Sequence, residues 1–120
     1  MTSANVLIID DDQGITESLS MLLEDEGYSV AIAKNGSEGL DYLLSHSLPR
    51  IILLDLMMPI MDGYTFRDEQ VKDTRLAAIP VVIMTAGSLT ARTAAMNAYT
   101  LLKKPIDIEH LLKSVHLHCA

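Results

Sequence analysis

The sequence predicts an α/β protein built on a single parallel sheet with helices on both faces. Its 120 residues suit one domain, and 49% hydrophobic against 21% charged residues indicates a folded globular chain. Short β-branched runs alternate with helical apolar patterns five times, which is typical of right-handed βαβ units. Several of these runs are almost entirely apolar, as expected for strands that are covered on both sides.

Five segments are expected to be strands. They cover residues 6–9, 28–33, 51–54, 81–85 and, with a weaker pattern, 99–103. Each run is rich in Val, Ile or Leu, or is aromatic at its start, and each ends abruptly at polar residues.

The segments between the strands are expected to be helices. Apolar residues at helical spacing predict one helix that ends before Gly27, a second that begins after Asn35 and a last one capped by Asp107. Segments 63–72 and 88–97 are also predicted to be helical, although their apolar spacing is poorer.

Charge and cysteine content exclude several classes of function. The net charge of −7 disfavours direct contact with the phosphate backbone of nucleic acids. Cys119 is the only cysteine, so no intrachain disulfide can form and a reducing compartment fits. The N-terminus does not resemble a signal peptide, and no apolar run is long enough to span a membrane. We therefore expect a cytoplasmic domain.

Polar residues follow four of the predicted strands, and they suggest a chemical site. Asp10 and Asp11 follow the first strand, Asp55 the third, Thr85 ends the fourth, and Lys104 comes after the fifth. Ligand sites in open parallel sheets lie beyond the carboxyl ends of the strands. Crowded carboxylates need a cation, and hard oxygen ligands favour Mg²⁺. A carboxylate in such a site can act as a nucleophile toward phosphorus, assisted by an ammonium and a hydroxyl.

Each of these residues also has an ordinary structural explanation. The acids at 10–12 could cap a helix, Asp55 could simply end a strand, and Lys104 alone would be a solvated surface lysine. Asp12 is expected to act only as a cap. It is the joint position of the others at successive strand ends that favours a functional site.

At this point the sequence resembles the receiver domains of bacterial two-component response regulators. The matching segments are VLIIDDD at 6–12, IILLDLMMPIMDG at 51–63, IPVVIMTAG at 79–87 and KPID at 104–107. The resemblance spans residues 1–120 as one receiver domain and implies a flavodoxin/CheY-like (βα)5 fold with strand order 2-1-3-4-5.

The resemblance implies a metal site and an acceptor. Asp55 would accept the phosphoryl group. Mg²⁺ would bind directly to Asp11 and Asp55, to Asp10 commonly through water, and to the backbone carbonyl of Met57.

The resemblance also implies two residues that respond to the phosphoryl group. Thr85 corresponds to the hydroxyl that moves toward it, and Lys104 corresponds to the lysine that neutralises it. The Lys104–Pro105 bond is expected to be cis, which X–Pro energetics permit.

Two features depart from the family pattern. The aromatic residue usually found three positions before the lysine is replaced by Leu101, while Tyr99 lies two residues earlier. The segment from Thr85 to Lys104 is also short, at 104 − 85 = 19 residues. Both departures fall on the face that receiver domains use for output.

By this resemblance the chain is a regulatory phosphoacceptor that catalyses only its own phosphorylation and dephosphorylation. Its expected partners are a histidine kinase or phosphotransfer protein, a downstream effector and, when phosphorylated, a second copy of itself. A receiver-like interaction domain that is not phosphorylated is the alternative. A dehalogenase-type hydrolase is disfavoured because Met57 stands where that class has a second Asp. A Gly-rich phosphate loop is absent after the first strand, which disfavours flavin or dinucleotide binding.

Overall fold

A single parallel sheet organises the protein in this computed structural model, which describes residues 4–87 and 90–119. The strand order is β2-β1-β3-β4-β5, and every neighbouring pair is parallel. The strands are β1 (Val6–Ile9), β2 (Val30–Ala33), β3 (Ile51–Asp55), β4 (Val81–Thr85) and β5 (Thr100–Lys103). The predicted fold class and strand order are confirmed.

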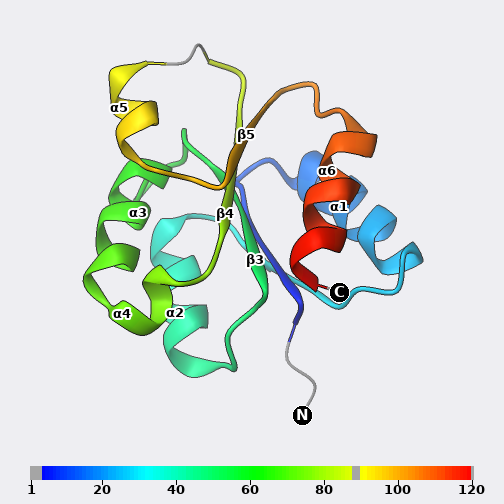
Figure 1. The fold of residues 1–120 in the computed structure, drawn as a ribbon, viewed down its shortest axis with the longest axis horizontal. Helices are drawn as coiled ribbons and strands as arrows, with labels where there is room; N and C mark the ends of the chain where they lie inside the picture. The colour runs from blue at the N-terminus through cyan, green and yellow to red at the C-terminus, as the bar shows by residue number, and fades with distance from the viewer. Residues whose placement is uncertain (1–3, 88–89, 120) are drawn as a thin grey trace.

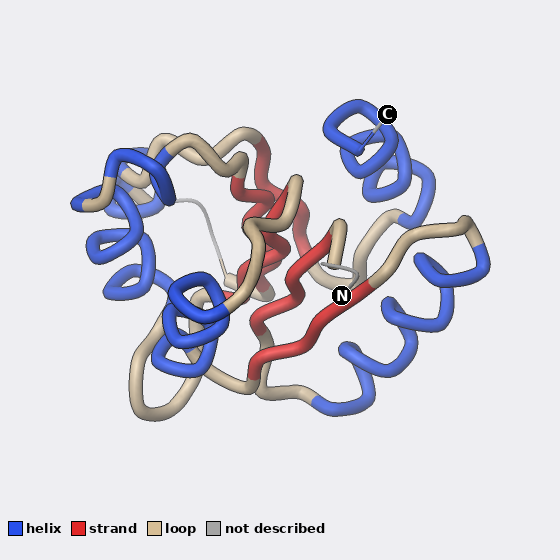
Figure 2. Tube along the Cα trace, turned by 90° about the horizontal axis from the view of Figure 1, so that it is seen from below, coloured by secondary structure: helices blue, strands red, loops and turns tan. Residues whose placement is uncertain are grey.

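Helices cover both faces of the sheet (Figures 1 and 2). The helices are α1 (Gln13–Asp25), α2 (Gly36–Ser45), α3 (Gly63–Lys72), α4 (Thr74–Ala77), α5 (Ala91–Ala95) and α6 (Ile108–Cys119). Helices α1 and α6 lie on one face, and α2 to α5 lie on the other (Figure 1). None of the helices within the described ranges is both long and apolar enough to cross a membrane.

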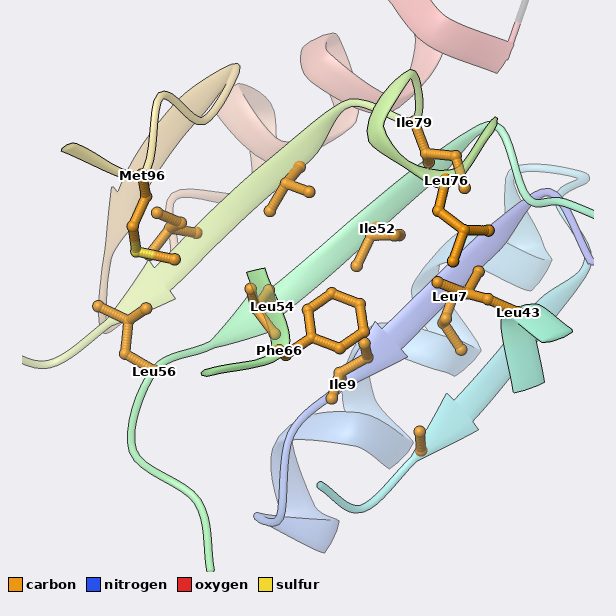
Figure 3. Close-up of a cluster of buried hydrophobic side chains, with 13 residues drawn as sticks. Leu7, Ile9, Leu43, Ile52, Leu54, Leu56, Phe66, Leu76, Ile79 and Met96 are labelled. Carbon is orange, nitrogen blue, oxygen red and sulfur yellow. The ribbon is translucent and has the colours of Figure 1, made fainter. Parts of the chain in front are cut away.

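The side chains of the central strands divide between two apolar cores because successive residues point to opposite faces. Leu7, Ile52 and Leu54 face the core under α2 and α3, whereas Ile8 and Leu53 face the core under α1 and α6. Figure 3 shows the first core, where the ring of the only phenylalanine, Phe66, packs between strand side chains. The polar strand ends therefore sit on a rigid aliphatic base.

Aspartate and asparagine side chains fix the starts of several helices, as predicted for Asn35 and for Asp107. Asn35 accepts a hydrogen bond from the Glu38 amide (2.9 Å), and Asp107 accepts one from the His110 amide (3.3 Å). Asp12 likewise accepts from the amide of residue 15 (3.2 Å) at the start of α1. Such caps satisfy amides that have no partner inside the helix.

The fourth helical segment is shorter than predicted. The prediction covered residues 88–97, of which 88 and 89 lie outside the described residues, and α5 occupies only Ala91–Ala95. Thr90 caps it by accepting a hydrogen bond from the Thr93 amide (3.2 Å). Asn97 then adopts a left-handed φ of 52°, which ends the helix.

One short helix, α4, was not predicted. It is a single turn capped by Asp73, and only Leu76 is buried. The buried amide of Gln70 donates hydrogen bonds to the carbonyls of Leu76 (2.9 Å) and Ile79 (3.2 Å) and so holds this turn against α3. A single turn contains too few residues to show an apolar period.

Gly63 is required where α3 starts against the end of β3. A Cβ atom at this position would lie 2.4 Å from the carbonyl oxygen of Asp55 and 2.9 Å from the Cα atom of Leu56. Both atoms belong to the backbone and cannot rotate away. We therefore expect Gly63→Ala to lower the free energy of unfolding by about 2 kcal/mol, as overpacking of a core typically does.

Urea unfolding measures the free energy of unfolding of Gly63→Ala against that of the wild type. Gly14→Ala is the matched control, because its nearest contact would be the end of the exposed Asp12 side chain at 3.3 Å and not a backbone atom. A Gly63→Ala protein as stable as the control would contradict the packing argument.

Candidate functional site

Strand register brings the predicted site residues to one edge of the sheet. Asp55 pairs with Met84 of β4, and Thr85 pairs with Lys103 of β5, so these strands end side by side. Asp10 follows directly after β1, and its amide donates to the carbonyl of Ala33 at the end of β2 (3.1 Å). Residues that are far apart in the sequence thus meet at the carboxyl ends of the strands.

Three carboxylates form the centre of this site. One oxygen from each of Asp10, Asp11 and Asp55 lies within 4.8 Å of the others. Asp10 and Asp55 are buried, with 1% and 6% of their surface exposed, whereas Asp11 is exposed. Two buried acids and one exposed acid therefore share a small volume that opens to solvent on one side.

Lys104 is the positive charge that holds the two buried acids. Its ammonium donates a hydrogen bond to Asp10 Oδ2 (3.0 Å) and lies 3.5 Å from Asp55 Oδ1. The other Asp10 oxygen accepts from the amide of Asp12 (2.9 Å), and Asp55 Oδ1 also accepts from the amide of Leu56 (2.9 Å). The adjacent Lys103 is exposed, as expected from the alternation of an extended chain.

Burial and like charge both affect the pKa of Asp55. Burial, and then the neighbouring Asp10 carboxylate, raise the pKa of Asp55 above its usual value, although Lys104 and the Leu56 amide act in the opposite direction. Burial disfavours the Lys104 ammonium, but its contacts with Asp10 and Asp55 outweigh this and raise the pKa of Lys104. The site therefore holds more negative charge than its single ammonium offsets.

The carboxylate cluster has the donor set that suits Mg²⁺. Each acid contributes a hard oxygen ligand, and the oxygens are close enough for one ion to contact them. Burial raises the pKa of Asp55 first and the Asp10 carboxylate adds to that effect, and a divalent cation would offset the negative charge that Asp10 contributes. The residues present therefore fit the ion that the sequence analysis predicted.

Thr85 and Met57 lie at the border of the site. Thr85 is buried, and its hydroxyl oxygen accepts a hydrogen bond from the Gly87 amide (3.0 Å). Within the described residues this hydroxyl makes no hydrogen bond to Asp55. Met57 lies in the loop after β3. Its side chain is exposed and therefore contributes little to packing.

The loop from Asp55 to Gly63 is fastened at both ends. The Gly63 amide donates to the carbonyl of Leu56 (2.9 Å), and the Gly36 amide at the start of α2 donates to that of Met61 (2.9 Å). Between these bonds Ile60 is exposed and has a left-handed φ of 69°. The Lys104–Pro105 peptide bond, across the site, is cis as predicted.

One wall of the site was not predicted from the sequence. A hollow of about 360 Å³ opens beside Asp10 and Asp11 and is also lined by Glu17 of α1 and by Lys34. Lys34 follows directly after β2, so the strand-end rule that selected the other residues could have selected it too. The direct pairing of Lys104 with Asp10 had no local signal, because 94 residues separate them.

Comparison with known proteins agrees with this geometry. The family model described as "Response regulator receiver domain" matches residues 6–116. Response regulator Rre1 of Synechocystis is 37% identical over 111 residues, which cover 89% of this chain and 48% of Rre1. Protein PilH of Pseudomonas aeruginosa is 33% identical over 116 residues, 94% of this chain and 95% of PilH.

Solved structures are similar along nearly the whole chain. Chemotaxis protein CheY4 of Vibrio cholerae superposes with a TM-score of 0.86 at 28% identity, over 98% of this chain and 99% of CheY4. The chain spans about half the length of Rre1 and of several other curated relatives. The match of the family model to residues 6–116, together with these relatives, shows that the chain belongs to the response regulator receiver domain family, the signalling domain of two-component systems.

Proposed function

We propose that Asp55 accepts a phosphoryl group and that the modified domain changes its affinity for a partner. The observation that carries this proposal is the position of the Lys104 ammonium, 3.0 Å from Asp10 and 3.5 Å from Asp55. A buried carboxylate beside a metal-type acid cluster and a fixed ammonium is arranged for phosphoryl transfer. The alternative, an interaction domain that is never phosphorylated, is disfavoured because keeping Asp10 and Asp55 buried side by side is costly.

The reaction consists of one bond exchange. A carboxylate oxygen of Asp55 attacks the phosphorus of a phosphohistidine on a kinase or phosphotransfer protein, and the bond between phosphorus and the imidazole nitrogen breaks. The nitrogen keeps the electron pair of that bond. Water later attacks the same phosphorus, the bond between phosphorus and the Asp55 oxygen breaks, and inorganic phosphate leaves as the Asp55 carboxylate is regenerated. The domain thus acts on its own acyl phosphate and has no external substrate besides the phosphodonor.

Neighbouring groups of the chain have defined roles in this proposal. Lys104 pairs with the added phosphoryl charge, and the Thr85 hydroxyl donates a hydrogen bond to a phosphoryl oxygen. Asp10, Asp11, Asp55 and the Met57 carbonyl would hold Mg²⁺. When bound, that ion supplies positive charge that offsets the phosphoryl oxygens.

Membership of the receiver domain family supports the cellular setting that we propose. We place the domain in the cytoplasm, with a histidine kinase or phosphotransfer protein upstream and an effector protein or domain downstream. Direct nucleic-acid binding by this domain is disfavoured by the net charge of −7. A phosphorylation-dependent homodimer belongs to the same proposal.

The acceptor assignment is tested by chemical phosphorylation. Acetyl phosphate with Mg²⁺ should add the mass of one phosphoryl group to the wild-type protein, whereas Asp55→Asn should gain none because it lacks the nucleophilic oxygen. Intact-protein mass spectrometry measures the difference, and a phosphate-affinity gel provides a second measurement.

Asp12→Asn is the matched control for this experiment. Its side chain lies next to the cluster but caps α1, and Asn caps a helix as well as Asp does. It should be labelled as the wild type is. Equal labelling of Asp55→Asn and the wild type would refute the assignment.

Mg²⁺ binding is predicted to depend on pH through Asp55. Its raised pKa means that the proton is held more tightly than by an ordinary Asp, and a bound proton competes with the metal. Affinity for Mg²⁺ should therefore be full above that pKa and fall as the pH drops through it. Asp11→Asn, which removes one ligand charge, should weaken binding by about tenfold or more at neutral pH.

Titration of backbone amide NMR signals with MgCl₂ gives both results, with Asp12→Asn again as the control. An affinity that stays constant from neutral to acidic pH would show that Asp55 is not a ligand. Unchanged affinity in Asp11→Asn would remove that residue from the site.

A further inference from the structure

A second hollow, of about 670 Å³, lies between the edge strand β5 and helix α6. It shares no wall residue with the hollow beside Asp10 and Asp11. Its volume is within the range that small-molecule sites occupy. The side chains that the argument uses are Tyr99 and Thr100 on the strand side and His110, Lys113, Ser114 and Leu117 on the helix side.

Ser114 is the buried polar residue in the wall of this hollow. It is 4% exposed, and within the described ranges 4–87 and 90–119 its hydroxyl makes no hydrogen bond. The equally buried hydroxyl of Thr16, by contrast, donates to the carbonyl of Gln13 (3.1 Å). A buried hydroxyl without a partner lowers stability, so this group is available to a ligand that enters the hollow.

The charge of the hollow differs from that of the whole chain. Lys113 is exposed, and among the described residues its ammonium has no ion-pair partner. Glu109 lies one helical turn before Lys113 but does not line the hollow. None of the described lining residues is acidic, although the net charge of the chain is −7. An anion would therefore find an unpaired cation here without a nearby competing carboxylate in the wall.

Two exposed apolar side chains lie beside these polar groups. Tyr99 is 47% exposed, and its ring is perpendicular to that of His118, with the ring centres 4.3 Å apart. Leu117 is also largely exposed. The contact with His118 restricts the Tyr99 ring, which makes it a surface on which a second aromatic ring can pack.

His116 belongs to the wall but is already engaged elsewhere. Its Nδ1 atom contacts the Tyr28 hydroxyl, and its Nε2 atom lies 3.4 Å from Glu26 Oε1. These contacts connect the last turns of α6 to the segment that precedes β2. The free polar groups of the hollow are therefore those of Lys113, Ser114, Thr100 and His110.

We propose that this hollow binds a small organic anion in which a carboxylate or phosphate group is attached to an aromatic ring. The Lys113 ammonium and the Ser114 hydroxyl donate to the oxyanion, and the ligand ring packs on Tyr99 and Leu117. The site does not include Asp55, so it neither requires the proposed phosphorylation nor fails with it.

The test is a titration of the full chain, without Mg²⁺, with phenyl phosphate and with benzoate. The backbone amide NMR signals of Thr100 and Ser114 should shift and saturate, with a Kd of about 1 mM for the better ligand. Inorganic phosphate lacks the ring and benzyl alcohol lacks the charge, so each should bind at least about tenfold more weakly. The tighter of the two anions identifies the preferred oxyanion.

Lys113→Gln should weaken binding of the better ligand by about tenfold, because it removes a charged hydrogen-bond donor. Lys72→Gln is the matched control, since it changes the net charge equally but lies on α3, where Lys72 pairs with Glu69 (2.7 Å). It should bind as the wild type does, and so should Asp55→Asn.

Ser114→Ala separates a ligand-binding hydroxyl from a small residue needed only for packing. Alanine suits a helix and the lost hydroxyl had no protein partner, so the free energy of unfolding in urea should stay equal or rise. Affinity should nevertheless fall about tenfold. Unchanged affinity in this variant would show that Ser114 serves packing alone, against the proposal.

Three further results would overturn the site. They are the absence of saturable shifts with both anions, equal affinities of Lys113→Gln and Lys72→Gln, and binding of inorganic phosphate as tight as that of phenyl phosphate. A failure of Asp55 to accept a phosphoryl group would leave all three measurements unaffected, so the two proposals are tested separately.

Discussion

The crowding of three carboxylates around one ammonium is the constraint on which the rest of the molecule depends. Water would separate these charges, so they stay together only because strands β1, β3 and β5 end at the same edge of a rigid sheet. The cost is visible in the raised pKa of Asp55, which burial and Asp10 cause together. The aliphatic cores on both faces of the sheet offset this cost without contributing to the chemistry.

Most of the fold and the centre of the site could be predicted from the sequence, because the patterns that indicate them lie within short segments of the chain. A buried parallel strand needs a run of apolar residues, so β1 and β4 were predicted with the bounds that the structure has. The polar residue that ends such a run marks the edge of the sheet, which is how Asp10 and Asp55 were selected. That Asp55 accepts a phosphoryl group remains a prediction.

Tertiary contacts determine what the sequence could not predict. Arg67 of another helix binds the carbonyls that follow α5, and the buried amide of Gln70 holds the single turn of α4. These partners are not neighbours in the sequence and leave no periodic signal. The same applies to Tyr64 and Thr93, whose hydroxyls are hydrogen-bonded to each other although the two residues are 29 positions apart and would each pass as an ordinary helix residue.

The position of Lys104 has a further consequence for the speed of the response. In the unmodified site the ammonium already lies between Asp10 and Asp55, so it needs only to exchange one anionic partner for another. Under the proposed function, little reorganisation of Lys104 would then be required when charge arrives at Asp55, because the compensating ammonium is already in place. Loss of the added group would leave the ammonium next to the two carboxylates that it contacts in this structure.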